Sequence, residues 1–181
     1  MAQEIRLEIP ANAFLFLLKS VPCEEAILRP RHTVTEENAA QEYLRARDLW
    51  TEQGWVELDF DGSLRPGRPL ARLLYTLVHR YAVLRWERDG MREFYVKGPV
   101  DLLHIVEEAG RMTMAQEPSR AALEHLREEL SACSQGTLEV LRISDQKALR
   151  VSLEGLTPGE EALKASVEAL KLFYEEAESN A

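Results

Sequence analysis

The stretch VLRWERDGMREFYVKG, residues 83–98, decides the fold class of this chain. Apolar and polar residues alternate on both sides of the pair Asp89-Gly90. Such a pair is the strongest short signal for a β-hairpin, because both positions of the tight turn need a positive φ angle. The sequence therefore predicts two antiparallel strands, residues 83–88 and 91–97, joined by this turn.

A second hairpin is predicted near the C-terminus, where residues 137–143 and 148–153 alternate around Asp145-Gln146. The stretch 100–108 is ambiguous, because its apolar residues fit either a short helix or a buried strand. A strand is favoured, followed by a turn at Ala109-Gly110 and another strand.

Residues 4–9 also alternate and predict a strand, which Pro10 ends. The segments between the strands predict amphipathic helices, because apolar residues recur in them three and four positions apart. The expected helices are residues 12–19, with Asn12 as cap, 35–53, 69–80, 119–132, with Ser119 as cap, and 158–178. Strands in hairpins with flanking amphipathic helices predict a single α+β domain over residues 1–181, built on an antiparallel β-sheet.

The charge of the chain restricts its partners. Of 181 residues, 31 are acidic and 22 basic, which gives a net charge of -9. An acidic surface argues against nucleic acid and against an anionic membrane as partners, since both attract basic faces. No apolar run approaches the roughly 18 residues of a membrane-spanning helix, so none is expected. Cys23 and Cys133 stand alone and far apart, which predicts a reducing, cytoplasmic compartment.

The segment ELDFDGSLRPGR, residues 57–68, nearly matches a calcium-binding EF-hand loop. Glu57, Asp59 and Asp61 fill the first three ligand positions, and Gly62 follows them. Arg68, however, stands where the template needs a bidentate glutamate, so no metal is expected. The alternative is a short edge strand with a solvated acidic face that ends in a turn, because apolar residues alternate with the acids: Val56, Leu58 and Phe60.

No cofactor and no catalytic residue is expected. The sequence contains no phosphate loop, no dinucleotide-binding fingerprint and no nucleophile motif. The four histidines lack the spacing of a helical zinc site, and neither cysteine belongs to a C-x-x-C pair. They are His32, His79, His104 and His125. Among apolar neighbours in a strand, His104 is expected to be a core histidine with its hydrogen bonds satisfied.

Five residues are candidates for contact with a protein partner. Trp55 follows Gly54 at a helix end, where exposure is expected. Arg85 and Arg88 flank the first hairpin turn among acids, in a pattern typical of a charged rim or of cross-strand pairs. Leu170 and Tyr174 belong to the apolar face of the last helix, together with Leu163 and Val167.

Three stretches carry a resemblance to a known family: LRARDLWTEQGWVELDFDGSLRPGRPLARLLYTLVHRYAVLRWERDG, REFYV and GRMTMAQEPSRAALEHLREEL. They give a helix that ends at a glycine, a short acidic link, a leucine-rich helix, hairpins, a proline and an amphipathic helix. From about Ala39 to Leu130 the chain resembles the EspG-type proteins, cytosolic chaperones of ESX (type VII) secretion, although it is shorter than their usual members. The opening strand and helix also match that family's beginning. The resemblance implies a non-enzymatic adaptor that holds a helical secretion substrate.

The first hypothesis is therefore a chaperone-like adaptor for a protein partner, and association into a homodimer is left open. The second is a small enzyme that uses carboxylates of the sheet, such as Glu57, Asp59 or Asp61. The third is an acidic regulatory protein; a DNA-binding regulator is disfavoured by the net charge of -9.

Overall fold

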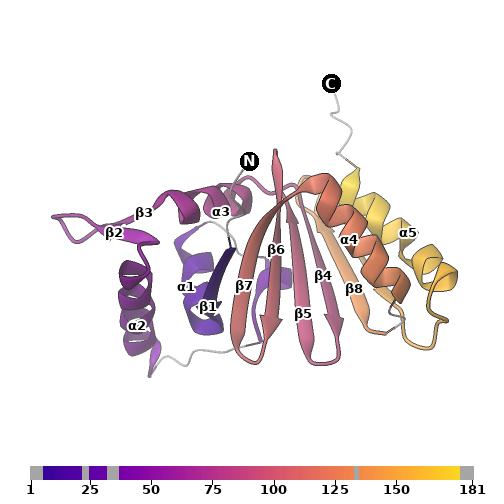
Figure 1. The fold of residues 1–181 in the computed structure, drawn as a ribbon, viewed down its shortest axis with the longest axis horizontal. Coiled ribbons are helices and arrows are strands. Elements are labelled where there is room, and N and C mark those ends of the chain that lie inside the picture. Colours follow the sequence, from indigo (N-terminus) through magenta and orange to yellow (C-terminus); the bar gives the residue numbers. More distant parts are fainter. Residues whose placement is uncertain (1–5, 22–24, 32–36, 133–134, 176–181) are drawn as a thin grey trace.

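The structure, a computed structural model, describes residues 6–21, 25–31, 37–132 and 135–175. Within these ranges the strands form a seven-stranded antiparallel sheet in the order β1-β7-β6-β5-β4-β8-β9 (Figure 1). The strands are β1 (Arg6–Pro10), β4 (Ala82–Arg88), β5 (Met91–Lys97), β6 (Asp101–Glu108), β7 (Arg111–Pro118), β8 (Thr137–Arg142) and β9 (Ala148–Ser152). A separate small hairpin pairs β2 (Val56–Leu58) with β3 (Leu64–Pro66).

The helices flank the sheet, so the predicted α+β fold with an antiparallel sheet is confirmed. They are α1 (Ala11–Ser20), the short 3₁₀ helix η1 (Ala26–Leu28), α2 (Ala39–Glu52), α3 (Arg68–Val78), α4 (Ser119–Ala132) and α5 (Glu160–Tyr174). The expected features at Cys23, His32, Thr35 and Cys133 lie outside the described residues.

The tight turns explain why the sheet forms from hairpins. Asp89 and Gly90 both have positive φ angles, 41° and 82°, as the two-residue turn between β4 and β5 requires. The ambiguous stretch 100–108 is a strand, because the following residues Ala109 and Gly110 close the same kind of turn, at φ angles of 49° and 78°. The predicted hairpin around Asp145-Gln146 is confirmed as β8 and β9.

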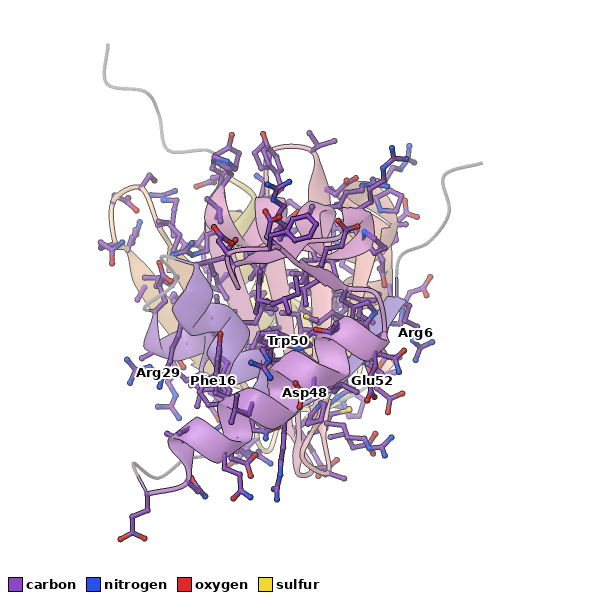
Figure 2. The ribbon with its side chains drawn as sticks, turned by 90° about the vertical axis from the view of Figure 1, so that its left-hand side faces the viewer. Arg6, Phe16, Arg29, Asp48, Trp50 and Glu52 are labelled. Atoms are coloured by element: carbon purple, nitrogen blue, oxygen red, sulfur yellow. The ribbon has the colours of Figure 1, made fainter. Side chains whose placement is uncertain are left out.

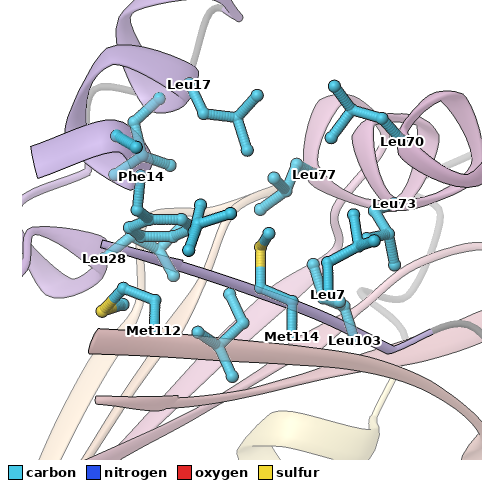
Figure 3. Close-up of a cluster of buried hydrophobic side chains, with 14 of the residues drawn as sticks. Leu7, Phe14, Leu17, Leu28, Leu70, Leu73, Leu77, Leu103, Met112 and Met114 are labelled. Carbon is cyan, nitrogen blue, oxygen red and sulfur yellow. The ribbon is translucent and has the colours of Figure 1, made fainter. Parts of the chain in front are cut away.

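One face of the sheet packs against α1, η1 and α3. Apolar residues of β1, β7 and β6 point toward the apolar sides of these helices, as Figure 3 shows. The fully or almost fully buried side chains in this cluster include Phe14, Leu28, Leu73, Leu77, Leu103, Met112 and Met114. Beyond this layer α2 lies across the end of the molecule, and its own Trp50 is buried on the side that faces the core (Figure 2).

The opposite face packs against α4 and α5. Trp86 and Tyr95 form the floor of this second cluster, while Leu126 and Phe173 reach it from the two helices, all fully buried. Successive side chains along a strand point into the two clusters in turn, so that Phe94 belongs to the first cluster and Tyr95 to the second. The central strands are covered on both faces, since helices of both layers contact them. The end strand β1 is covered by α1 on one face, and the end strand β9 by α5 on the other.

Several helix ends differ from the prediction: α2 begins at Ala39, after turn residues 37–38, and α3 ends at Val78. Asn12 does not cap α1, because the helix begins at Ala11 directly after Pro10. Asn12 lies inside the first turn and donates a hydrogen bond to Glu42, which ties α1 to α2. At the other end of the chain α5 begins at Glu160, two residues later than expected, after Gly159 with a φ angle of 100°.

Candidate functional site

The last helix, α5, rests on the sheet through small side chains. Ala162, Ser166 and Ala169 are fully buried together with Phe173. Ser166 satisfies its own hydroxyl by donating to the carbonyl oxygen of Ala162, at 2.8 Å. These residues recur four and three positions apart, so they mark the face of the helix that lies closest to the strands.

A second apolar face of α5 is turned sideways, toward α4. Leu163, Val167, Leu170 and Tyr174 line a groove between the two helices, and Leu123 of α4 lines its other wall. The groove has a volume of about 710 Å³. Val167 remains 40% exposed. The apolar face identified in the sequence is thus only partly buried, and it forms a surface open to solvent.

The rim of this α4–α5 groove carries charges. Arg127 of α4 and Lys171 and Glu175 of α5 border it. Lys171 Nζ lies 3.2 Å from the carboxylate of Glu168, in an exposed pair. Arg127 forms no salt bridge within the described part of the chain. The groove thus combines apolar walls with a rim that carries two cations, Arg127 and Lys171, and one carboxylate, Glu175.

Tyr174 sits at the C-terminal end of the groove. Its hydroxyl is buried and has no hydrogen-bond partner among the described residues. Burial raises the pKa of Tyr174 to about 12, so the side chain stays neutral. Lys97 of β5 holds this end of the helix in place, because its Nζ donates to the carbonyl oxygen of Tyr174 at 2.8 Å.

A network of buried charges lies between α4 and the sheet. The ring of His104 lies 3.0 Å from Glu93 through Nε2 and 3.5 Å from Glu117 through Nδ1. Tyr95, directly opposite His104 in the β5–β6 register, stacks on its ring with 4.4 Å between centroids. The hydroxyl of Tyr95 donates to Glu93 at 2.9 Å. His104 is therefore the hydrogen-bonded core histidine that the sequence predicts.

Electrostatics keep this network ionised. Burial alone would raise the pKa of Glu93, but His104 and Arg88 more than offset it and hold the pKa at about 2. Burial would likewise lower the pKa of His104, yet hydrogen bonds to Glu117 and Glu93 raise it to about 9. Burial and the neighbouring Glu93 also raise the pKa of Tyr95. At neutral pH the pair is thus a carboxylate with an imidazolium.

Arg88 and Arg85 both form ion pairs, on opposite faces of β4. Arg88 donates to Glu93 and to Glu129 of α4, each at 2.7 Å, and its guanidinium lies 3.9 Å over the ring of Trp86. Arg85 pairs with Glu139, the residue opposite it on β8. The predicted cross-strand pairing is confirmed for both arginines, and Arg88 in addition joins the sheet to α4.

The exposure expected for Trp55 is wrong, because only 8% of this residue is accessible. The backbone explains its burial. The Trp55 N–H donates to the carbonyl of Trp50, and the Gly67 N–H donates to the carbonyl of Trp55, so the chain folds back over it. A Cβ at Gly67 would come within 2.8 Å of the Gly54 carbonyl oxygen, which shows how close these backbones lie.

The segment that resembles an EF-hand loop forms the β2–β3 hairpin. Asp59 pairs with Arg65 at 2.6 Å, and Asp61 accepts a hydrogen bond from the backbone of Ser63 at 2.9 Å. Among the described residues no group of three or more His, Cys, Asp or Glu side chains is arranged to hold a metal ion. The predicted short strand and Asp-Gly turn are confirmed as β2 and the turn at Asp61-Gly62, while the apolar residues after Val56 are uncovered, with Leu58 58% exposed and Phe60 fully exposed. The hairpin is short and projects from the rest of the molecule, so no other element of the described chain covers these two side chains.

Of the five candidate contact residues, only Leu170 and Tyr174 share a site, the α4–α5 groove. Arg88 belongs to the network under α4, while Arg85 and Trp55 lie on the other face of the sheet. The network itself was missed beyond His104. Its signal is that polar residues interrupt the apolar side of two adjacent strands: Glu93 next to Tyr95, and His104 next to Leu102.

A scan against models of protein families finds no match, and neither does a search of the curated proteins. Among the residues described, the structure contains no helix that is both long enough and apolar enough to cross a membrane. The resemblance to EspG-type chaperones remains a hypothesis.

Proposed function

We propose that the protein is a non-enzymatic adaptor that binds an amphipathic helix of a protein partner in the α4–α5 groove. The observation that carries this proposal is the orientation of α5. Four of its apolar side chains, Leu163, Val167, Leu170 and Tyr174, line an open groove, while the face with Ala162, Ser166, Ala169 and Phe173 packs on the sheet. A helix laid in such a groove inserts apolar residues three and four positions apart.

The dimensions of the groove support a helix as the occupant. The stripe from Leu163 to Tyr174 extends over about 16 Å at roughly 1.5 Å per residue, or about three helical turns. A volume of about 710 Å³ accommodates several apolar side chains. Arg127 lies at the rim without a salt bridge to any described residue, so it favours a partner whose apolar stripe is flanked by carboxylates.

The competing reading as an enzyme finds less support. Asp61 is fully exposed, and its pKa is lowered by hydrogen bonds from Ser63, whereas a catalytic acid needs a raised pKa. The strongly perturbed pair, Glu93 and His104, lines neither the α4–α5 groove nor the polar pocket beside Arg31. Ion pairs that stabilise a fold also perturb pKa values. The adaptor reading requires no cofactor, nucleic acid or membrane.

Within this proposal the adaptor works in the cytoplasm, and a helical secretion substrate is the partner that the EspG-type resemblance implies. The chemistry of the groove defines the partner more narrowly than that resemblance does. It requires one amphipathic helix with aliphatic residues along about three turns and at least one acidic neighbour.

A binding measurement with designed peptides tests the proposal. The probes are a helical peptide with leucines three and four positions apart and flanking glutamates, and a scrambled peptide of the same composition. The first should bind and the second should not. Val167→Glu should weaken binding at least about tenfold, because it places a carboxylate in the apolar wall. Val100→Glu is the matched control, because Val100 is 76% exposed and does not line the groove.

Charge reversal sharpens the same experiment. Arg127→Glu should weaken binding of the glutamate-flanked peptide and favour a lysine-flanked one, since Arg127 is the cation at the rim that has no salt bridge to a described residue. Equal binding of the ordered and scrambled peptides would refute the proposal. So would a Val167→Glu variant that is folded and still binds like the Val100→Glu control.

A further inference from the structure

The tip of the β2–β3 hairpin presents an apolar side chain to solvent in a fixed geometry. Phe60 is fully exposed, and Leu58 beside it is 58% exposed. The turn that carries Phe60 is closed by backbone hydrogen bonds from Asp59 to Ser63, at 2.8 Å, and from Gly62 to Asp59, at 2.9 Å. An exposed apolar group on an ordered projection is typical of a contact surface.

The hairpin and the α4–α5 groove lie at opposite ends of the molecule. In Figure 1 the longest axis of the molecule is horizontal, with the hairpin at one end of the view and α5 at the other. A chain cannot place its own tip in its own groove. A second copy, however, can bring its tip to the groove of the first.

The two surfaces complement each other in polarity and in charge. The tip consists of apolar residues flanked by acids, with Glu57 and Asp61 exposed on either side of Leu58 and Phe60. The groove has apolar walls and carries two cations, Arg127 and Lys171, against one carboxylate, Glu175, at its rim. Lys171 pairs with Glu168, so Arg127 is the cation left to meet the tip's acids. Association thus places the tip's carboxylates near Arg127, and it removes the aromatic ring of Phe60 from water.

We propose that the β2–β3 tip of one copy docks into the α4–α5 groove of a second copy. This inference rests on the proposed function, because it makes the helix-binding groove subject to occupation by the protein itself. The contact is heterologous, since each copy contributes a different surface, so it closes into a ring, of which a reciprocal pair is the smallest, or extends into a chain. Two apolar side chains bury far less than the roughly 1,200 Å² of a stable interface, so the association is weak and reversible.

Sedimentation velocity from about 10 μM to about 1 mM, the range expected for such a weak contact, tests the inference. The average mass of the wild-type protein should rise with concentration above that of a monomer, to a closed reciprocal pair or to larger species. Phe60→Ser, which removes the tip, and Val167→Glu, which blocks the groove, should each leave a monomer. Val100→Glu should associate like the wild type. Phe60 and Val167 are accessible, so circular dichroism should show both variants folded.

Mixing the two defective variants gives the sharpest result. Phe60→Ser retains an intact groove and Val167→Glu an intact tip, so an equimolar mixture can form one docking contact per pair. Dimers should appear in the mixture, and no larger species. A wild-type protein that stays monomeric throughout the range would overturn the inference, and so would a mixture that stays monomeric while the wild type associates.

Failure of the inference can be distinguished from failure of the proposed function. Phe60→Ser leaves the groove unchanged and should bind the glutamate-flanked helical peptide like the wild type. In the wild type, the same peptide should disperse the assemblies by competing for the groove. Peptide binding without self-association would contradict only the inference, whereas self-association without peptide binding would contradict the helix-binding function and retain the tip–groove contact.

Discussion

Raising the pH from 6 to 9 should destabilise the protein through His104. The pKa of this ring is raised from 6.5 to about 9 by its carboxylate neighbours, against the effect of burial. A group whose pKa is higher in the folded than in the unfolded chain contributes stability that is fully present below the unfolded value. This contribution is lost as the pH rises through the folded value. The shift corresponds to roughly 3 kcal/mol at about 1.4 kcal/mol per pH unit.

The direction in which stability changes with pH depends on the charged groups that face the His104 ring. Glu93 and Glu117 both have lowered pKa values, so they stay ionised throughout this range, and the loss of charge occurs on His104 alone. The ring centroid of His125, on α4, lies 6.1 Å from that of His104, and His125 is exposed. Below the range the same ion pair should weaken again, because the stability from Glu93 is present above pH 4.5 and is lost as the pH falls toward 2.

Urea unfolding at half-unit steps between pH 6 and 9 measures the effect. The wild-type free energy of unfolding should fall by about 3 kcal/mol over the range. His104→Phe preserves an aromatic ring against Tyr95 but binds no proton, so its stability should be lower at pH 6 and should vary little above it. His79→Phe, at an exposed histidine whose ring centroid lies 4.5 Å from that of Tyr75, is the matched control and should retain the wild-type slope. A flat wild-type profile, or a His104→Phe profile with the wild-type slope, would refute the assigned ion pair.

Two backbone substitutions should move stability in opposite directions. Ala109 has a φ angle of 49°, which costs a residue with a Cβ about 1–2 kcal/mol, whereas asparagine tolerates it. Ala109→Asn should therefore stabilise the protein by about 1 kcal/mol and raise Tm by roughly 2–4 °C in calorimetry. A lower Tm would show that this turn is not under strain. Gly136 has a φ angle of 101°, and a Cβ there would lie 2.2 Å from the carbonyl oxygen of Glu87. Gly136→Ala should cost at least about 2 kcal/mol in urea unfolding, since strain and a backbone clash add, and an unchanged midpoint would contradict the close approach of these strands.

The parts of the fold that could be predicted from sequence are those with local causes. Asp89-Gly90 specifies a turn within two residues, and alternation around it specifies the strands, so the sheet of hairpins follows. The stretch 100–108 was ambiguous because both of its faces are covered in the sheet. A strand buried on both faces loses its alternation of apolar and polar residues.

The site could be predicted only in part, because it depends on how distant elements meet. The sequence identifies Leu170 and Tyr174 as apolar neighbours on a helix, but the direction they face is set by the small residues Ala162 and Ser166. Trp55 was placed at the surface because a glycine precedes it, yet the returning chain at Gly67 covers it. Such contacts between segments leave no periodic signal.

The buried ion network illustrates the same limit. Glu93, His104 and Arg88 come from three strands and meet through the register of the sheet, while Glu129 reaches them from α4. Each residue alone is unremarkable in an acidic, charge-rich chain. The local signal for such a network is a charged residue on the apolar side of a strand. It predicts that the residue is buried together with an oppositely charged or hydrogen-bonding group, but it does not identify that group.

The alternation along β5 gives the sheet a mechanical role. Phe94 and Val96 pack into one hydrophobic cluster while Tyr95, between them, packs into the other, and all three are fully buried. The strand β5 thus contributes side chains to both hydrophobic clusters. Loss of either helical layer would expose one face of β5 and so weaken the packing of the layer on the other face. Amide hydrogens of residues 94–96 should therefore exchange with solvent only when the whole chain unfolds, whereas those of β9, covered on one face at the sheet's end, exchange through local opening.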